Sequence, residues 1–343
     1  MIEFGSDFHS CENTFVSNSN YFEGIGRLNH YASGRQAIED IIEQENWERI
    51  WIPVYFCYEV INYISSLGIE VKLYDDNPLK IGDDDIVRLL PYKEGDVLLR
   101  VNYFGLRNKR SNKELTIPVI EDHTHSIVSD WAINSDADWC VASLRKSLPI
   151  ACGGILWSPQ KRNIPKKIHT SEECEKMADI RYEAMQAKAL YLDNGGDKNK
   201  FREKFIQSEE MIEELSLTNI DTKSLNIIEN MDIMQWFDNR RYNWEILCSK
   251  LSDKFNIIKP SHNEVFYPFA AVILCDSHKE REKLRQYLIK NSIYPAILWN
   301  IPDSCEYPIA LDFSKKMLSI HCDARYNADE ITSMCQIINA YYD

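Results

Sequence analysis

The sequence predicts an α/β protein with a mainly parallel central sheet, followed by a smaller α+β portion at the C-terminal end. Two observations predict this class. Three apolar runs bounded by polar or glycine residues lie within 117–158, and such runs are typical of strands buried on both faces. Further strands are predicted at 49–53, 70–74 and 97–102. A helical pattern over 57–67 separates the first two of these, and strand–helix–strand order indicates a right-handed parallel unit.

The first clear helix is predicted within residues 31–45, with Ser33-Gly34 at its start. Apolar residues then recur at helical spacing, at Ala37, Ile38, Ile41 and Ile42. A helix start exposes free amide hydrogens and the positive end of the helix dipole, which suits a phosphate. Ser33 could equally be an ordinary N-cap. Arg35 could add a charge-assisted bond to a phosphate or face solvent.

Composition and charge exclude several classes of protein. The 343 residues carry a net charge of −14, which argues against nonspecific binding to nucleic acid or to anionic membranes. No apolar run is long enough to span a bilayer, and the first residues do not have the pattern of a secretory signal. The ten cysteines are scattered without metal-ligand spacing. We therefore expect reduced thiols, a cytoplasmic location and no metal site.

The stretch 117–158 carries the strongest chemical signal. Asp122 follows one apolar run, and Lys146 follows the next, 24 residues later. Because a parallel sheet delivers functional groups at the carboxyl ends of its strands, the two side chains could converge on one crevice. Asp122 alone could be a loop acid or a helix cap, but Lys146 stands before Leu-Pro, an unusual place for a surface lysine. An acid and a lysine placed in this way suit pyridoxal 5′-phosphate (PLP), with the lysine forming the Schiff base and the acid holding a proton on the pyridine nitrogen.

Three motifs in this stretch also resemble a known family. They are Val-Ile-Glu-Asp-X-X-His over 119–125, Ser-Leu-Arg-Lys-X-Leu-Pro over 143–149, and Gly153-Gly154. This combination is similar to the DegT/DnrJ-type aminotransferases, which are fold type I PLP-dependent enzymes. The resemblance implies transfer of an amino group from an amino acid such as glutamate to a nucleotide-linked keto sugar. Such reactions belong to the biosynthesis of surface polysaccharides or secondary-metabolite sugars.

The resemblance also implies roles for single residues. Ser33, Gly34 and Ser143 would bind the cofactor phosphate, with Arg35 beside them. The ring of PLP would stack on an aromatic residue of the run 55–58, for which we take Tyr58, although the closest register places Cys57 there. His125 stands where the family carries a glutamine that bonds the phenolic oxygen, and imidazole can donate the same bond. Trp299 and Arg325 match substrate-proximal positions of the family.

The resemblance further divides the chain into two domains. We expect a large PLP-binding α/β domain over 25–235 and a small α+β domain over 236–343, on which 1–24 pack. Helices are predicted near 171–190, 198–215, 233–254, 278–291 and 328–342, and strands at 264–275 and 317–321. Fold type I enzymes build each site from two chains, so a homodimer is implied. The helical middle section supports it with apolar side chains that look exposed, namely Tyr182, Met185, Leu190, Tyr191, Phe201 and Phe205.

Two other hypotheses about function stay open at this point. One is a PLP-dependent lyase or dehydratase on the same fold, although family dehydratases have histidine in place of the lysine. The other is a non-catalytic protein that binds PLP or a sugar in a regulatory role, which the departures at Cys57 and His125 keep possible. The visible spectrum of the purified protein, before and after addition of an amino donor, separates these hypotheses.

Overall fold

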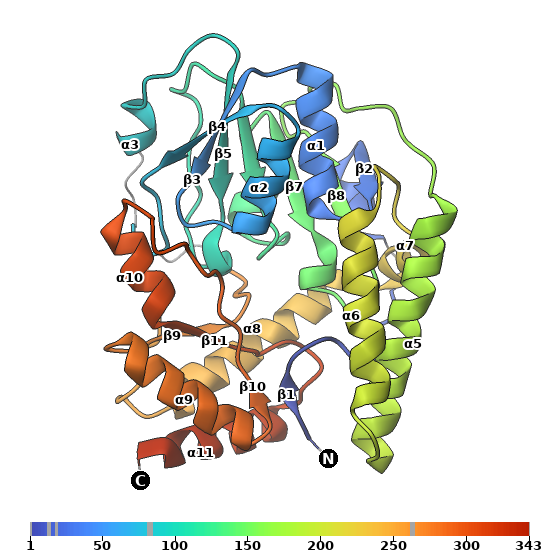
Figure 1. Cartoon of the computed structure of the whole chain (residues 1–343), viewed down its shortest axis with the longest axis vertical. Coiled ribbons are helices and arrows are strands. Elements are labelled where there is room, and N and C mark those ends of the chain that lie inside the picture. The colour runs from blue at the N-terminus through green and yellow to red at the C-terminus, as the bar shows by residue number, and fades with distance from the viewer. Residues whose placement is uncertain (1, 12–14, 18–19, 81–84, 261–264, 343) are drawn as a thin grey trace.

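The computed structural model describes residues 2–11, 15–17, 20–80, 85–260 and 265–342. Its centre is a seven-stranded sheet in the order β2–β8–β7–β6–β5–β3–β4. The strands are β2 (Leu28–Tyr31), β3 (Arg49–Pro53), β4 (Glu70–Tyr74), β5 (Asp96–Val101), β6 (Val119–Asp122), β7 (Trp139–Ser143) and β8 (Gly154–Trp157). The five strands from β7 to β4 are parallel. The predicted α/β class with a mainly parallel sheet is confirmed (Figure 1).

The strand β8 departs from the parallel arrangement, because it pairs antiparallel with both β7 and β2. Two successive reversals give β2 the same direction as β7 and β6. In the register, Gly154 lies opposite both Ser143 and Tyr31. The chain therefore leaves β2 at the edge where β6 and β7 end, and it delivers Ser33 to the neighbourhood of Asp122.

The inner strands β5, β6 and β8 are buried on both faces, whereas the edge strand β4 is partly exposed. Along β5, Val97 and Leu99 belong to one hydrophobic core, whereas Leu98 between them belongs to the other. The helices α1 (Gly34–Glu45) and α2 (Tyr58–Ser66) contribute apolar residues to the first core. The long helix α5 (Glu172–Asn194) contributes to the second. Successive side chains of a strand point to opposite faces of the sheet, so they enter different cores when both faces are covered.

The middle of the chain is helical, as predicted. It contains α5, α6 (Asn199–Glu214) and α8 (Ile233–Lys250), together with the unpredicted α7 (Thr222–Asn230). The expectation that its aromatic residues lie on the surface was wrong. Between α5 and α6 the chain buries its own apolar side chains, at Tyr182, Met185, Tyr191, Phe201 and Phe205, while Leu190 is exposed. The two helices pack against each other as a hairpin, so these residues no longer argue for a second subunit.

The C-terminal portion pairs β9 (Ala271–Leu274) antiparallel with β11 (Met317–Ile320). Its helices are α9 (His278–Lys290), α10 (Pro308–Lys316) and α11 (Ala328–Asn339). The predicted strand over 264–275 was too long, and Glu264 lies outside the described residues. Pro268 cannot donate to a ladder, and the amide of Phe269 donates to the carbonyl of Phe104, 2.8 Å away, instead of to a strand.

The N-terminal segment lies on this C-terminal portion, where β1 (Phe4–Gly5) pairs with β10 (Ile293–Tyr294). Short helices complete the described fold at α3 (Asp85–Arg88) and α4 (Asp130–Ile133), with 3₁₀ turns at Tyr21–Ile25, Tyr103–Gly105, Leu144–Lys146 and Ala340–Tyr342. The limits 25–235 and 236–343 stay our proposal for the domains. Of the described helices, none has both the length and the apolar character needed to cross a membrane.

Candidate active site

One pocket lies at the carboxyl edge of the central sheet. It is lined by residues that follow three different strands, including Ser33, Gly34, Asp122, Ser143 and Lys146. Asp122 ends β6, Ser143 ends β7, and Gly34 begins α1 directly after β2. Parallel strands bring their ends to one edge, and the double reversal through β8 adds β2 to them. The structure therefore brings the predicted acid, lysine and phosphate-type residues together.

Lys146 ends the short 3₁₀ turn Leu144–Lys146 that follows β7, and its side chain is exposed at the pocket. The neighbouring Arg145 guanidinium, and then partial removal from water, lower the pKa of Lys146 from its ordinary 10.5 to about 8. A lowered pKa means that a larger share of the amine is neutral near pH 7 than in an ordinary lysine. Since the neutral amine is the nucleophile, this environment favours attack on a carbonyl carbon.

Asp122 is buried at the end of β6, where its Oδ1 accepts the backbone N–H of Thr124 at 2.7 Å. Burial raises the pKa of Asp122 above its ordinary value, against the opposing effect of that hydrogen bond. The carboxylate is therefore a better proton acceptor than a solvated aspartate. Thr124, which the sequence analysis did not single out, also lines the pocket. Its Oγ1 accepts the N–H of Ser143 at 2.9 Å and joins the ends of β6 and β7.

The residues around the start of α1 fit a phosphate group. Ser33 Oγ is buried without a hydrogen-bond partner and does not cap the helix, so the ordinary N-cap role does not account for it. A Cβ atom on Gly34 would lie 3.0 Å from the Cβ of Ser143, so any side chain there would force β7 or the helix start to shift. The first amides of α1 and the side chains of Ser33 and Ser143, called the cradle below, are the donors available to an anion here.

Arg35 lines the pocket, but its guanidinium is already engaged elsewhere. Its Nη2 donates to the carbonyl of Ile212 at 2.7 Å, and its Cζ lies 4.9 Å from the centre of the Tyr63 ring. Arg35 therefore holds the end of α6 against α1. These contacts occupy only Nη2 among its nitrogens, so the bond to a phosphate that we expected from Arg35 stays a prediction.

Of the aromatic residues in the run 55–58, Phe56 lines the pocket and Tyr58 does not. Phe56 and Cys57 line the pocket, whereas Tyr58 begins α2 and interacts with Cys305. Phe56 precedes the helix, Cys57 is its extended N-cap, and Tyr58 is its first residue, so the chain changes direction between Phe56 and Tyr58. The expectation that Tyr58 stacks on the cofactor is thus not met, and Cys57, which the closest register favoured, lies at the pocket beside Phe56.

His125 stands behind the pocket wall instead of lining it. Its ring stacks on Trp299, which does line the pocket, with ring centres 5.3 Å apart. His125 Nδ1 accepts the N–H of Phe104 at 2.9 Å. Burial, and then the charges of Lys146 and Arg240, lower the pKa of His125 to about 3, so the imidazole is neutral. His125 therefore supports Trp299 as a neutral imidazole.

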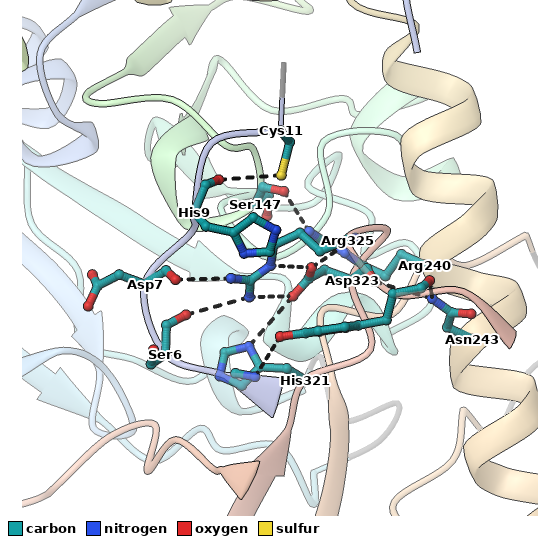
Figure 2. Close-up of polar contacts among 12 residues, drawn as sticks. Ser6, Asp7, His9, Cys11, Ser147, Arg240, Asn243, His321, Asp323 and Arg325 are labelled. Carbon is teal, nitrogen blue, oxygen red and sulfur yellow. Dashed lines mark hydrogen bonds and ion pairs between the residues drawn. The ribbon is translucent and has the colours of Figure 1, made fainter. Parts of the chain in front are cut away.

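Arg325 does not reach the pocket, in contrast to the expected substrate contact. Figure 2 shows it between Asp323 and the N-terminal segment. Its Nε lies 2.7 Å from Asp323 Oδ1, and its Nη1 donates to the carbonyl of Asp7 at 3.0 Å. The side chain is 1% exposed. Arg325 thus anchors residues 6–8 to the C-terminal portion of the chain.

The helix α6 forms a wall of the pocket that the sequence did not reveal. Glu209, Ile212 and Glu213 of this helix line the pocket opposite the strand ends. Arg145 Nη1 pairs with Glu209 Oε1 at 2.8 Å, although the two residues are 64 positions apart. The charged and apolar pattern of α6 is that of an ordinary solvated helix, so no local signal distinguishes these positions.

We compared this chain with known proteins and solved structures. No protein-family model matches the sequence, and no curated protein matches it either. Solved structures do match. The PLP form of Spr1654 from Streptococcus pneumoniae, named a sugar aminotransferase, is 13% identical with a TM-score of 0.62, covering 96% of this chain and 93% of that one. The chain has the fold of type I aminotransferases.

Two further structures share this fold. A DegT DnrJ EryC1 StrS aminotransferase from Brucella abortus is 13% identical with a TM-score of 0.60, covering 96% of this chain and 92% of its own. DesI, solved in the presence of its TDP-sugar product, is 12% identical with a TM-score of 0.61, covering 92% of this chain and 81% of its own. The likeness to DegT/DnrJ-type enzymes that the motifs indicated thus extends over nearly the whole chain, at low sequence identity.

Proposed function

We propose that this protein is a PLP-dependent aminotransferase. The observation that carries the proposal is that Lys146 and Asp122 line one pocket with the cradle of Ser33, Gly34 and Ser143. These are a nucleophilic amine, a basic carboxylate and a set of donors for an anion, a combination that suits PLP. The fold shared with aminotransferases supports the proposal, and so does the lysine, because a dehydratase of the resembled family has histidine there.

Each group has a distinct task in this proposal. The hydroxyls of Ser33 and Ser143 and the amides of α1 would hold the phosphate. Asp122, whose basicity burial increases, would keep a proton on the pyridine nitrogen. When bound, PLP would supply an electron sink for the bonds at the substrate carbon. Lys146 would hold the cofactor through its amine and, when free, would carry a proton to and from the substrate carbon. Trp299, held by the stacked His125, shields this side of the pocket.

The proposed substrates are an amino acid donor such as glutamate and a keto sugar linked to a nucleotide. DesI, which shares the fold, was solved with its TDP-sugar product. The motif resemblance points the same way. We place the reaction in the biosynthesis of a surface polysaccharide or of a secondary-metabolite sugar.

The visible spectrum of the purified full chain with added PLP tests this function. We expect an absorbance band from covalently attached cofactor that borohydride makes permanent and that glutamate abolishes. Keto sugar nucleotides should then restore the band, because they accept the amino group. A band that no amino donor changes would indicate a passive PLP-binding protein, and the complete lack of a band would contradict the proposal.

A homodimer whose partner subunit completes the site is part of the proposal, as the motif resemblance implies. The aromatic residues of α5 and α6 do not support it, since they are buried within one chain. Sedimentation at micromolar concentration gives the oligomeric state directly. A monomer that carries PLP and turns over at full rate would contradict the shared site.

A further inference from the structure

Two arginines beside Lys146 converge on a single carboxylate. Arg145 forms a bidentate ion pair with Glu209, in which Nη1 donates to Oε1 at 2.8 Å and Nη2 donates to Oε2 at 3.2 Å. Arg181 of α5 adds a third bond, from Nη1 to the same Oε1 at 2.6 Å. This two-armed contact is the arrangement in which guanidinium binds carboxylates most strongly. The three side chains thus form a ready-made site for one carboxylate.

Glu209 is the most exposed of the three side chains in this site. The side chains of Arg145 and Arg181 are 13% and 8% exposed, whereas that of Glu209 is 38% exposed. Glu209 can therefore turn away into solvent while the arginines stay in place. Burial acts to raise the pKa of Glu209, but Arg145 and Arg181 lower it to about 2. Because Glu209 is ionised at all ordinary pH values, a competing anion and not a proton must displace it.

The helix that carries Glu209 does not depend on this ion pair. Arg35 donates to the carbonyl of Ile212, and Gln36 donates to the carbonyls of Leu215 and Ser216 at 3.1 and 2.9 Å. These contacts hold the C-terminal end of α6 against α1. Displacement of the Glu209 side chain would therefore leave the wall of the pocket standing.

Two carboxylates neutralise the two guanidinium groups, so an incoming anion must exchange with one of them. Both guanidinium groups share Glu209, and the second carboxylate, Asp7, lies 3.2 Å from Arg181 with 43% of its side chain exposed. Arg145 Nε is in addition buried without a hydrogen-bond partner. Exchange of one carboxylate for another keeps both arginines paired, so it avoids the large cost of leaving a buried charge alone.

We propose that Arg145 and Arg181 form a binding subsite for a carboxylate of the amino donor, which Glu209 occupies while the donor is absent. This inference rests on the proposed function and extends it to the donor side of the pocket. Since Arg145 directly precedes Lys146 and both line the pocket with Glu209, a donor held here has its amino group near the lysine. The subsite selects an acidic amino acid or the α-carboxylate shared by all amino acids.

Calorimetric titration of the full chain with glutarate, which has two carboxylates and no amino group, tests the subsite with and without PLP. We expect Glu209→Gln to tighten glutarate binding about tenfold, because the internal competitor is removed. Arg145→Met should weaken it roughly 10- to 100-fold, through loss of charge-assisted bonds. Arg181→Met should act in the same direction. Arg162→Met is the matched control, since Arg162 pairs with Asp138 at 2.8 Å outside this pocket.

Whether Glu209→Gln strengthens or weakens glutarate binding decides the proposal. If the three side chains only stabilise the fold, Glu209→Gln will weaken glutarate binding or leave it unchanged, and the subsite is overturned. Inorganic pyrophosphate is the second probe. Tightening for pyrophosphate alone would assign the arginines to the diphosphate of a sugar nucleotide and overturn the donor subsite. A chain that binds glutarate as expected but forms no PLP band would refute the aminotransferase proposal and not the subsite.

Discussion

Trp236 donates its indole N–H to the carbonyl oxygen of Ser147, 2.9 Å away, and so ties helix α8 to the residue that follows Lys146. Arg240, one turn further along α8, donates to the same carbonyl at 2.5 Å (Figure 2). Both donors are fully buried. Since α8 continues into the C-terminal portion of the chain, the position of the lysine turn is coupled to that portion.

This double contact predicts non-additive effects of mutation. Trp236→Phe or Arg240→Met alone leaves the Ser147 carbonyl one donor, so we expect PLP to attach to Lys146 at a rate within a few-fold of normal. The double variant leaves a buried carbonyl unpaired, which costs about 1–3 kcal/mol. We expect it to slow attachment about tenfold or more, while noncovalent PLP affinity changes little. Stopped-flow absorbance measures the rate.

The matched control for this prediction is Trp244→Phe. Trp244 lies on the same helix and is buried, but its Nε1 has no hydrogen-bond partner. The replacement therefore removes a similar ring volume without removing a bond. Equal slowing by Trp244→Phe and Trp236→Phe would show that packing alone, and not the bond to Ser147, positions the lysine.

Lys146→Ala should abolish both the absorbance band of covalently attached PLP and turnover. The amine at the end of the β7 turn is the group we assign to attachment, and alanine has no nucleophile. Absorbance and mass spectrometry after borohydride reduction measure the attachment. Persistence of covalent cofactor in this variant would assign the bond to another lysine.

Asp122→Asn should bind PLP and yet lose most activity. An amide cannot keep the pyridine nitrogen protonated, so the electron sink weakens. A loss of roughly 10²- to 10⁴-fold in kcat is expected, as for the removal of other single electrostatic groups from active sites. Steady-state kinetics at saturating PLP measure it. Turnover near the original rate would mean that Asp122 only orders the loop through its bond to Thr124.

The lowered pKa of Lys146 predicts the pH dependence of PLP attachment. Attachment requires the neutral amine, so its rate should rise with pH and level off above about 8, not above the ordinary 10.5. Arg145 lowers this pKa and Glu209 raises it. Arg145→Met should therefore move the midpoint of the rate profile to higher pH, and Glu209→Gln should move it to lower pH. Midpoints that coincide in all three proteins would refute this electrostatic assignment, and Arg162→Met serves as the control.

Local sequence patterns predict many of the strands and those site residues that follow strands. Strands β3 and β4 were predicted at their observed bounds, because a helical pattern and a glycine separate the two stretches. Asp122 and Lys146 were predicted to converge because each follows an apolar run, and the ends of parallel strands meet at one edge of a sheet. The role of Ser143 came from the motif resemblance.

Residues whose role depends on distant partners could not be predicted in this way. Phe56 lines the pocket and Tyr58 does not, because the chain enters α2 between them. Arg325 matches a motif, but Asp323 and the N-terminal segment hold it away from the pocket. Glu209 meets Arg145 only because α5 and α6 fold back as a hairpin over the strand ends. The sequence by itself determined which residues end the strands, whereas the tertiary structure decided which helix covers them, because that choice rests on packing between segments far apart in the chain.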